Sequence, residues 1–324
     1  MLDKDLFKLN EKQKATREGF GEALLEIGSN EKIVALCADL TESVKMDVFR
    51  NKYPNKFFEM GIAEQAMASV ASGMAAMGYI PFMASYAAFS PGRNWEQIRT
   101  TICYNDQPVK VIGAHTGLSV GPDGATHQAL EDMALMRMIP NMNVFVPCDA
   151  KEAYEITKFF ENFEHPAYLR LTREKTAVIL DEDYKFNFGK AYIIHLPKKV
   201  FNHKVGIIAC GPIIYEAIKA AIELEKDGIG VTVVNMPTVK PLDDQFLFRF
   251  SKTVNAIVTV EEHQVTGGLG SAVAEFLSEH QPTKVVKVGV QDRFGQSGKP
   301  KELYEEYGLT SKHIEEKVRT VVSR

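Results

Sequence analysis

One glutamate of this 324-residue chain stands where a carboxylate can take part in proton transfer. Glu64 lies in the motif GIAEQ (61–65), at the junction of an expected strand and an expected helix, and residues 65–92 carry no charged side chain. Burial in such a setting raises the pKa of a carboxyl group, which can then share a proton with a ligand nitrogen. The structural alternative is a glutamate that the helix dipole stabilises in the first turn of a helix.

A glycine-rich loop, HTGLSVGPDGATHQ (115–128), holds a second group of reactive side chains. Its glycines allow tight turns and a close approach of the backbone to a ligand. We expect His115, Asp123 and His127 to converge there on a polyhydroxylated substrate. Their spacing does not fit the short-range patterns of zinc sites, so no metal site is predicted.

Several other side chains are candidates for binding anions or rings. A guanidinium group is suited to phosphate, although most arginines are solvated surface groups. The turn GGLGS (267–271) precedes an expected helix, but it lacks the full dinucleotide-binding motif, so tight packing is the favoured interpretation. Aromatic residues normally fill the core, and a few of them are also placed to stack on a ligand ring. The candidates of these two kinds are Arg17, Arg170 and Arg173, and Tyr86, Phe89 and Trp95.

The elements that position these side chains follow an alternation of strands and helices typical of α/β proteins. Short, almost continuous apolar runs predict parallel strands covered on both faces, and ligands collect beyond the carboxyl ends of such strands. We predict a first domain over residues 1–185, a linker over 186–203 and a smaller doubly wound domain over 204–324. The expected strands are 33–39, 57–60, 79–84, 108–115, 143–148 and 167–172, then 205–210, 231–236, 256–262 and 284–290.

The composition is that of a globular protein and argues against several classes of function. Of the residues, 45% are hydrophobic and 25% are charged, and the formal net charge is -4. This balance gives no general attraction to nucleic acids or membranes, and we expect neither as a partner. Four cysteines lie dozens of residues apart, and the N-terminal residues 1–14 are polar. We therefore expect separate thiols, no signal peptide and a cytoplasmic location.

Taken together, the motifs resemble those of the C-terminal half of transketolases over essentially the whole chain. Seven motifs in the family's order make the resemblance specific. The chain has no Gly-Asp-Gly…Asn motif, by which the family holds magnesium and the diphosphate of thiamine diphosphate. The resemblance thus implies a split enzyme. The motifs are ATRE (15–18), ADLTES (38–43), GIAEQAMASVASGMA (61–75), the loop 115–128, PNMNVFVPCDA (140–150), LRLTRE (169–174) and EEHQVTGGLGSA (261–272).

For the cofactor, the resemblance implies that this chain binds the aminopyrimidine end of thiamine diphosphate. Glu64 would hydrogen-bond the ring nitrogen and favour the imino form, whose exocyclic nitrogen deprotonates the thiazolium carbon. Tyr86 and Phe89 would pack around the pyrimidine, and Asp39 would support the pocket. The diphosphate, with Mg²⁺ or Ca²⁺, would lie on an N-terminal transketolase subunit. The small residues after Glu64 would pack at a subunit interface, with an α2β2 assembly as the expectation.

For the substrate, the resemblance implies transfer of a two-carbon ketol unit from a ketose phosphate to an aldose phosphate, a reaction of the pentose phosphate pathway. His127 would lie near the reacting end of the sugar as a second catalytic residue, and Asp123 would lie at a sugar hydroxyl. Residues 90–95 stay unassigned, because this region differs in length from that of other members. The residues implied for the substrate phosphate are Arg17, Ser43, His115 and Arg173.

Two other functions remain open from the sequence. The β subunit of a 2-oxoacid dehydrogenase has the same two-domain layout, but the polar loop 115–128 is better suited to a sugar phosphate than to an oxoacid. Deoxyxylulose-phosphate synthase shares GIAEQ, yet its loop is less similar. A non-catalytic paralogue would keep the fold alone. The presence of Glu64, His115, Asp123 and His127 argues against that alternative.

Overall fold

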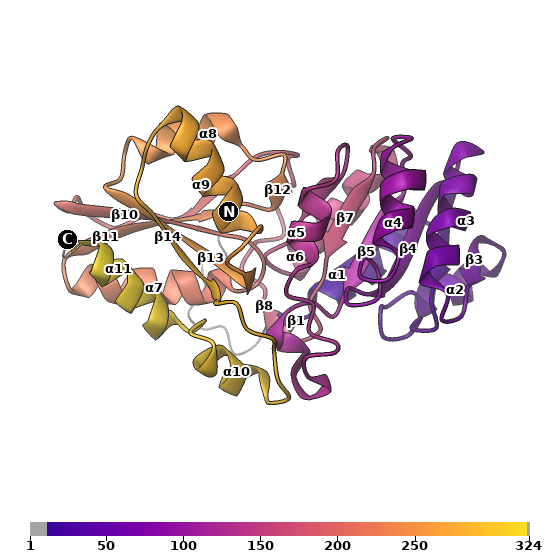
Figure 1. Ribbon diagram of the computed structural model, residues 1–324, viewed down its shortest axis with the longest axis horizontal. Coiled ribbons are helices and arrows are strands. Elements are labelled where there is room, and N and C mark those ends of the chain that lie inside the picture. The colour runs from indigo at the N-terminus through magenta and orange to yellow at the C-terminus, as the bar shows by residue number, and fades with distance from the viewer. Residues whose placement is uncertain (1–11, 323–324) are drawn as a thin grey trace.

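The apolar runs of the first half pair as neighbouring strands in the computed structural model, which describes residues 12–322 (Figure 1). The sheet has the order β12-β6-β7-β5-β4-β2-β3, and its neighbours are parallel except for β12 and β6. The predicted parallel sheet is thus confirmed. Its strands are β2 (Ile33–Cys37), β3 (Phe57–Glu59), β4 (Ile80–Tyr86), β5 (Lys110–Ala114), β6 (Asn143–Phe145), β7 (Ala167–Arg170) and β12 (Thr238–Lys240).

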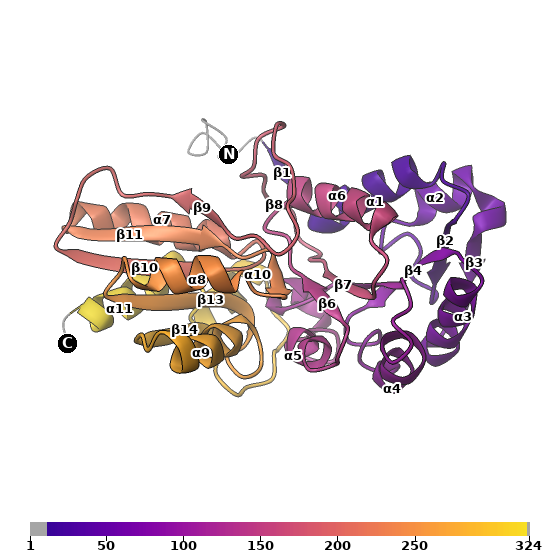
Figure 2. The same cartoon turned by 90° about the horizontal axis from the view of Figure 1, so that it is seen from above.

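Helices cover both faces of this sheet, because its strands are apolar on both sides. In β2, Ile33 and Ala35 point into the core beneath α1 and α6, whereas Val34 and Leu36 point into the core beneath α3. Figure 2 shows α1, α2 and α6 on one side and α3, α4 and α5 on the other. The helices are α1 (Thr16–Ile27), α2 (Asp47–Lys52), α3 (Glu64–Ala76), α4 (Trp95–Gln97), α5 (Asp132–Arg137) and α6 (Ala150–Phe159), with short helices η1 (Pro54–Lys56), η2 (Ile98–Cys103), η3 (Leu118–Asp123) and η4 (Phe160–Asn162).

The second half forms a five-stranded sheet in the order β14-β13-β10-β11-β9. Its four long strands are parallel, and β9 is antiparallel to β11. Helices α7 and α11 cover one face, while α8 and α9 cover the other (Figure 1). The elements are β9 (Tyr192–His195), β10 (His203–Ala209), α7 (Ile214–Lys226), β11 (Ile229–Asn235), α8 (Asp244–Ser251), β13 (Ala256–Gln264), α9 (Leu269–His280), β14 (Val285–Val290), α10 (Pro300–Glu306) and α11 (Ser311–Val322).

The sequence pattern did not predict several elements, among them helices α2, α5, α10 and α11 and several short strands. β9 lies within the segment interpreted as a linker, and β12 comes from the second half of the chain but pairs with the first sheet. A two-stranded sheet of β1 (Gln13–Lys14) and β8 (Thr176–Ala177) was also unforeseen. Strands of two to four residues are too short to show a hydrophobic period.

The four cysteines are free and buried, and burial raises the pKa of each thiol. Within residues 12–322, no helix has both the length and the apolar character needed to cross a membrane. The polar stretch 1–14, from which we expect no signal peptide, lies mostly outside the described residues.

Candidate active site

Glu64 is the first residue of α3 and is 4% exposed. Its carboxylate is not alone, because Arg93 Nη1 donates a hydrogen bond to Glu64 Oε1 at 2.9 Å. The Arg93 guanidinium also lies over the Phe89 ring, 4.2 Å from its centroid. The uncharged setting inferred from residues 65–92 was therefore incomplete, because the next charged residue along the chain reaches back to the carboxylate.

The rings of Tyr86, Phe89, His115 and His127 form one cluster. From the sequence, the first two are assigned to the cofactor and the two histidines to the substrate. The Tyr86 ring, at the carboxyl end of β4, stacks on His115 with 3.8 Å between ring centroids. The Phe89 ring meets His127 edge-on at 5.4 Å and lies 6.0 Å from Tyr86. Because Arg93 connects Phe89 to Glu64, this cluster joins the buried carboxylate to the loop 115–128.

A cationic cluster, formed by Arg17 and Arg173 beside His115, borders these rings. Arg17 Nη1 lies 3.3 Å from His115 Nε2 and donates to the backbone carbonyl of Ser43 at 2.7 Å. Arg173 Nη1 donates to the Val120 carbonyl at 2.8 Å and pairs with Asp123 at 3.1 Å. The fold thereby brings together Arg17 and Arg173, which are 156 positions apart in the sequence.

The charges and protonation states in this cationic cluster favour the binding of an anion. Burial, reinforced by Arg17 and Arg173, lowers the pKa of His115 to about 3, so its imidazole is neutral. Burial also lowers the pKa of Arg17, and nearby Arg173 acts in the same direction. Among the described residues, Arg17 Nε and His115 Nδ1 are buried without a hydrogen-bond partner. An anion would meet two guanidinium groups, of which Arg173 pairs with the partly exposed Asp123 and Arg17 lies near the carboxylates of Glu18 and Glu174.

Asp39 lies at the carboxyl end of β2 with its backbone in the left-handed region (φ 57°). Its side chain is exposed, and its backbone N–H donates to Glu59 Oε1 at 2.8 Å. Glu59 also accepts hydrogen bonds from the Thr41 hydroxyl and the Gly61 backbone. Sequence reasoning missed Glu59, although its place at the end of β3, next to GIAEQ, was a usable signal.

Three weaker candidates turn out to be structural. Arg170 is 3% exposed, and its guanidinium donates to both carboxylate oxygens of Asp132. It is therefore not available to a ligand. Trp95 Nε1 donates to the Leu135 carbonyl, and its ring packs on the core. The GGLGS turn does bind an anion, but that anion is the protein's own Glu261 carboxylate, which accepts two backbone N–H groups of α9.

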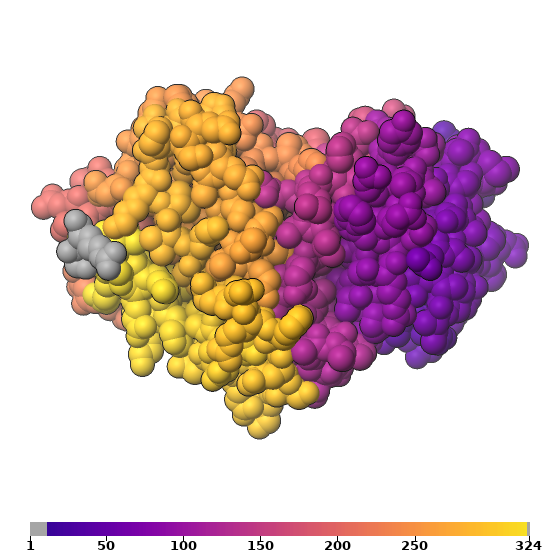
Figure 3. All heavy atoms as spheres, viewed as in Figure 1, coloured from indigo at the N-terminus to yellow at the C-terminus, as the bar shows by residue number. Residues whose placement is uncertain are grey.

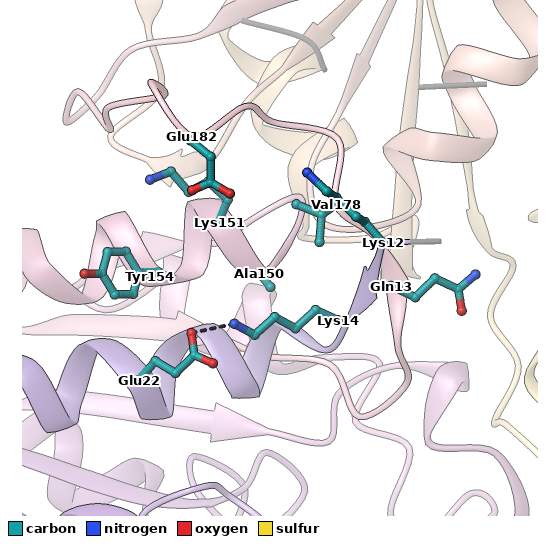
Figure 4. A pocket seen from close by; sticks show the side chains of 9 residues that line it. All are labelled: Lys12, Gln13, Lys14, Glu22, Ala150, Lys151, Tyr154, Val178 and Glu182. Carbon is teal, nitrogen blue, oxygen red and sulfur yellow. Dashed lines mark hydrogen bonds and ion pairs between the residues drawn. The ribbon is translucent and has the colours of Figure 1, made fainter. Parts of the chain in front are cut away.

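A hollow of about 500 Å³ lies on the α1 and α6 side and is lined by lysine and glutamate side chains (Figure 4). Lys14 is paired with Glu22, as drawn in the figure, and Lys151 is paired with Glu155. Glu182 projects into the same space. Within the described residues, no group of three His, Cys, Asp or Glu side chains is arranged to hold a metal ion.

Two family profiles match the chain in tandem. The profile of the transketolase pyrimidine-binding domain covers residues 12–178, and that of the transketolase C-terminal domain covers residues 195–314. The chain belongs to the transketolase family. The resemblance to the C-terminal half of transketolases, inferred from seven motifs, is thus confirmed.

Individual relatives match this transketolase-family chain from end to end. A transketolase C-terminal section from Methanocaldococcus jannaschii is 38% identical over 97% of this chain and 98% of its own length. The 6-deoxy-6-sulfo-D-fructose transketolase subunit SqwH of a Clostridium species is 37% identical, covering 95% of this chain and 94% of that protein. A solved split gene transketolase, an inactive β4 tetramer, superposes with a TM-score of 0.86 at 43% identity, covering 96% of this chain and 99% of the other.

Proposed function

We propose that this chain is the C-terminal subunit of a split transketolase, which transfers a two-carbon ketol unit from a ketose phosphate to an aldose phosphate. The supporting observation is the continuity of one site. The buried Glu64 carboxylate connects through Arg93 and the aromatic cluster to the cationic cluster of Arg17 and Arg173. A cofactor end and an anion-binding end thus lie in one place.

At the cofactor end, Glu64 and Phe89 fit an aminopyrimidine. They already hold a flat group that carries N–H donors, because the Arg93 guanidinium lies on the Phe89 ring and donates to Glu64. A bound pyrimidine would replace that guanidinium, with Glu64 holding the proton at the ring nitrogen. Tyr86 would pack at the pyrimidine, and Asp39, at the carboxyl end of β2, would support the cofactor pocket. Thiamine diphosphate, when bound, supplies the carbon nucleophile that accepts the ketol unit.

At the substrate end, we assign the phosphate to Arg17, Arg173, His115 and Ser43. Charge-assisted hydrogen bonds from two arginines are the strongest neutral-pH interactions available for such a group. The name of the Clostridium relative includes a sulfonated sugar, which also presents a tetrahedral anion. Asp123 and His127 lie on the same loop, where they would face the sugar hydroxyls and the reacting carbonyl.

The partner would cover the outer face of α3. Ile62 and Met77 at the two ends of this helix are 73% and 79% exposed, and Val70 between them is 38% exposed. A Cβ at Gly73 would meet nothing within 4 Å, so this small residue leaves room for another chain. Exposed apolar groups on a helix and just beyond its two ends favour a protein partner. We assign this face to an N-terminal subunit that carries the diphosphate and Mg²⁺ or Ca²⁺, in an α2β2 assembly with a second copy of each chain.

The test is ketol transfer by this chain reconstituted with the N-terminal subunit that co-purifies with it. Glu64→Gln should lower kcat by about a hundredfold or more, because general acid–base groups contribute at least that much. Glu216→Gln, a glutamate in the first turn of α7 in the other domain, is the matched control and should leave kcat unchanged. Near-normal turnover by Glu64→Gln would contradict the role of Glu64. Decarboxylation of a 2-oxoacid without ketol transfer would instead identify the dehydrogenase function.

A further inference from the structure

The C-terminal domain packs against the loop 115–128 through a buried polar seam. Figures 1 and 3 show the yellow segment with α10 lying against the magenta loop that contains η3. Three polar residues of this seam, Ser119, Gln128 and Glu262, are each buried to at least 96%. Buried polar groups of this kind need hydrogen-bond partners. The seam provides them across the domain boundary for the Ser119 N–H, the Glu262 carboxylate and the Gln128 side-chain N–H, whereas Gln128 Oε1 is buried without a partner among the described residues.

Glu262 on β13 is the acceptor at the centre of the seam. The Ser119 backbone N–H donates to Glu262 Oε1 at 2.7 Å, and the Tyr304 hydroxyl donates to Oε2 at 2.8 Å. The Glu262 backbone carbonyl accepts from Arg170 at 3.0 Å. A Cβ at Gly117 would lie 2.4 Å from Glu262 Oε1, so the loop approaches as closely as only glycine allows.

Gln128, at the far end of the loop, forms a hydrogen bond to the C-terminal domain. Its Nε2 donates to the carbonyls of Gln296 at 2.9 Å and Gly121 at 3.2 Å. Close packing also joins Gly124 to Ser297, since a Cβ at Gly124 would lie 2.6 Å from the serine hydroxyl. Both arms of the loop are therefore held by the C-terminal domain.

This attachment reaches Arg173 of the cationic cluster through two neighbouring loop residues. Ser119, which donates to Glu262, is followed by Val120, whose carbonyl accepts the hydrogen bond from Arg173. Arg173 in turn pairs with Asp123 farther along the loop. A shift of Ser119 would displace the Val120 carbonyl and, with it, the Arg173 guanidinium.

We propose that Glu262 is a positioning residue, by which the C-terminal domain sets the loop 115–128 for binding the anionic end of the substrate. The inference rests on the proposed function, because it takes this loop as the substrate site. Glu262 touches neither substrate nor cofactor in this account. It acts through Ser119 and Val120 on Arg173.

Glu261, the preceding residue of β13, provides a matched control. It is also a fully buried glutamate that accepts two backbone N–H groups, at 2.8 Å each from Leu269 and Gly270. Those partners lie at the start of α9, within the C-terminal domain. A general loss of stability should follow Glu261→Gln and Glu262→Gln alike, whereas only Glu262→Gln should alter the loop.

Amide hydrogen exchange of the full-length chain tests the contact without reference to activity. In Glu262→Gln the backbone N–H of Ser119 can donate only to a neutral side-chain amide oxygen, which is a weaker acceptor than a carboxylate oxygen. Residues 117–124 should therefore exchange faster than in the wild type. Glu261→Gln should leave exchange in that segment unchanged. Tyr304→Phe, which removes one hydrogen bond to Glu262 and keeps the ring, is the milder second variant and should show a smaller increase.

Kinetics of the reconstituted complex test the consequence for the site. Glu262→Gln should raise KM for the ketose phosphate, and Ki for inorganic phosphate, by about tenfold, the value of one hydrogen bond to a charged group. The thiamine diphosphate dissociation constant should stay within twofold or so of the wild type, because Glu64 and Phe89 do not lie on the loop.

Each outcome bears on a different claim. Loss of substrate, phosphate and cofactor affinity together, or unchanged exchange over residues 117–124 in both Glu262→Gln and Tyr304→Phe, would overturn the positioning role. A wild-type complex that transfers no ketol unit would contradict the proposed function, and the exchange experiment would still decide whether Glu262 orders the loop.

Discussion

The arginine at the domain seam and the arginines beside the loop have opposite surroundings. Arg170 is buried, and its N–H groups are divided between both oxygens of Asp132 and the carbonyls of Ala129 and Glu262. Arg17 and Arg173 instead lie near each other and near a neutral histidine, and Arg173 pairs with the partly exposed carboxylate of Asp123.

The difference separates a structural ion pair from a binding site. A buried cation that is paired with its own carboxylate has its N–H groups satisfied by the protein. Removing either partner is strongly destabilising, because the other charge is left buried without a counter-charge. Arg17 donates to a backbone carbonyl beside a neutral ring, and the pair of Arg173 with Asp123 is partly exposed, so both arginines keep affinity for an anion from outside. Removing each kind of arginine should therefore have a different consequence, and three measurements test this contrast.

The largest effect is expected from the buried pair. Arg170→Met should lower the free energy of unfolding by about 3–5 kcal/mol, because it leaves the Asp132 carboxylate buried without its cation. Urea denaturation of the full-length chain measures this. The double variant Arg170→Met with Asp132→Leu should recover most of the loss, and a single-variant loss below about 1 kcal/mol would contradict the structural assignment.

The next effect is expected in binding rather than in stability. Arg173→Ala should raise KM for a ketose phosphate by about tenfold to a hundredfold, and KM for the unphosphorylated ketose far less. Its unfolding free energy should change by less than about 1 kcal/mol, since its pair with Asp123 is partly exposed.

Arg293→Ala is the control for that experiment, because Arg293 forms a comparably exposed pair with Glu306 in the C-terminal domain. It should leave both KM values unchanged. Equal increases in KM for the phosphorylated and free sugars in Arg173→Ala would show that Arg173 does not bind the phosphate.

The effect that is smallest at neutral pH concerns the proton affinity of His115. Its pKa is lowered to about 3 by burial and then by Arg17 and Arg173, below the 6.5 of an ordinary histidine. The unfolded chain thus binds more protons between pH 6.5 and 3, so this group lowers stability as the pH falls through that range. The slope is at most about 1.4 kcal/mol per pH unit.

His115→Gln should flatten the pH dependence of unfolding below pH 6.5. The NMR titration of the His115 ring should show it neutral at pH 5, and saturating inorganic phosphate should raise its pKa, since an anion stabilises imidazolium. A pKa near 6.5 that phosphate leaves unmoved would remove His115 from the anion-binding residues.

The sequence predicted the central strands and the motif residues better than it predicted their partners. β2 was recognisable because all five of its residues are buried, whereas the edge strands β9 and β12 show no period. Arg17, Arg170 and Arg173 looked equivalent, because the partner that distinguishes Arg170, Asp132, lies 38 positions away. Glu262 was missed for the same reason, since its contact with Ser119 spans 143 positions.

In the proposed split enzyme, this chain holds only half of a thiamine diphosphate site. Calorimetric titration of thiamine diphosphate with Mg²⁺, into the chain alone and into the chain mixed with its N-terminal partner, measures whether the second half is needed. We predict negligible binding by the chain alone and saturable binding by the mixture, weakened by Glu64→Gln. Tight binding by the isolated chain, or no binding by the mixture, would contradict the split-site account.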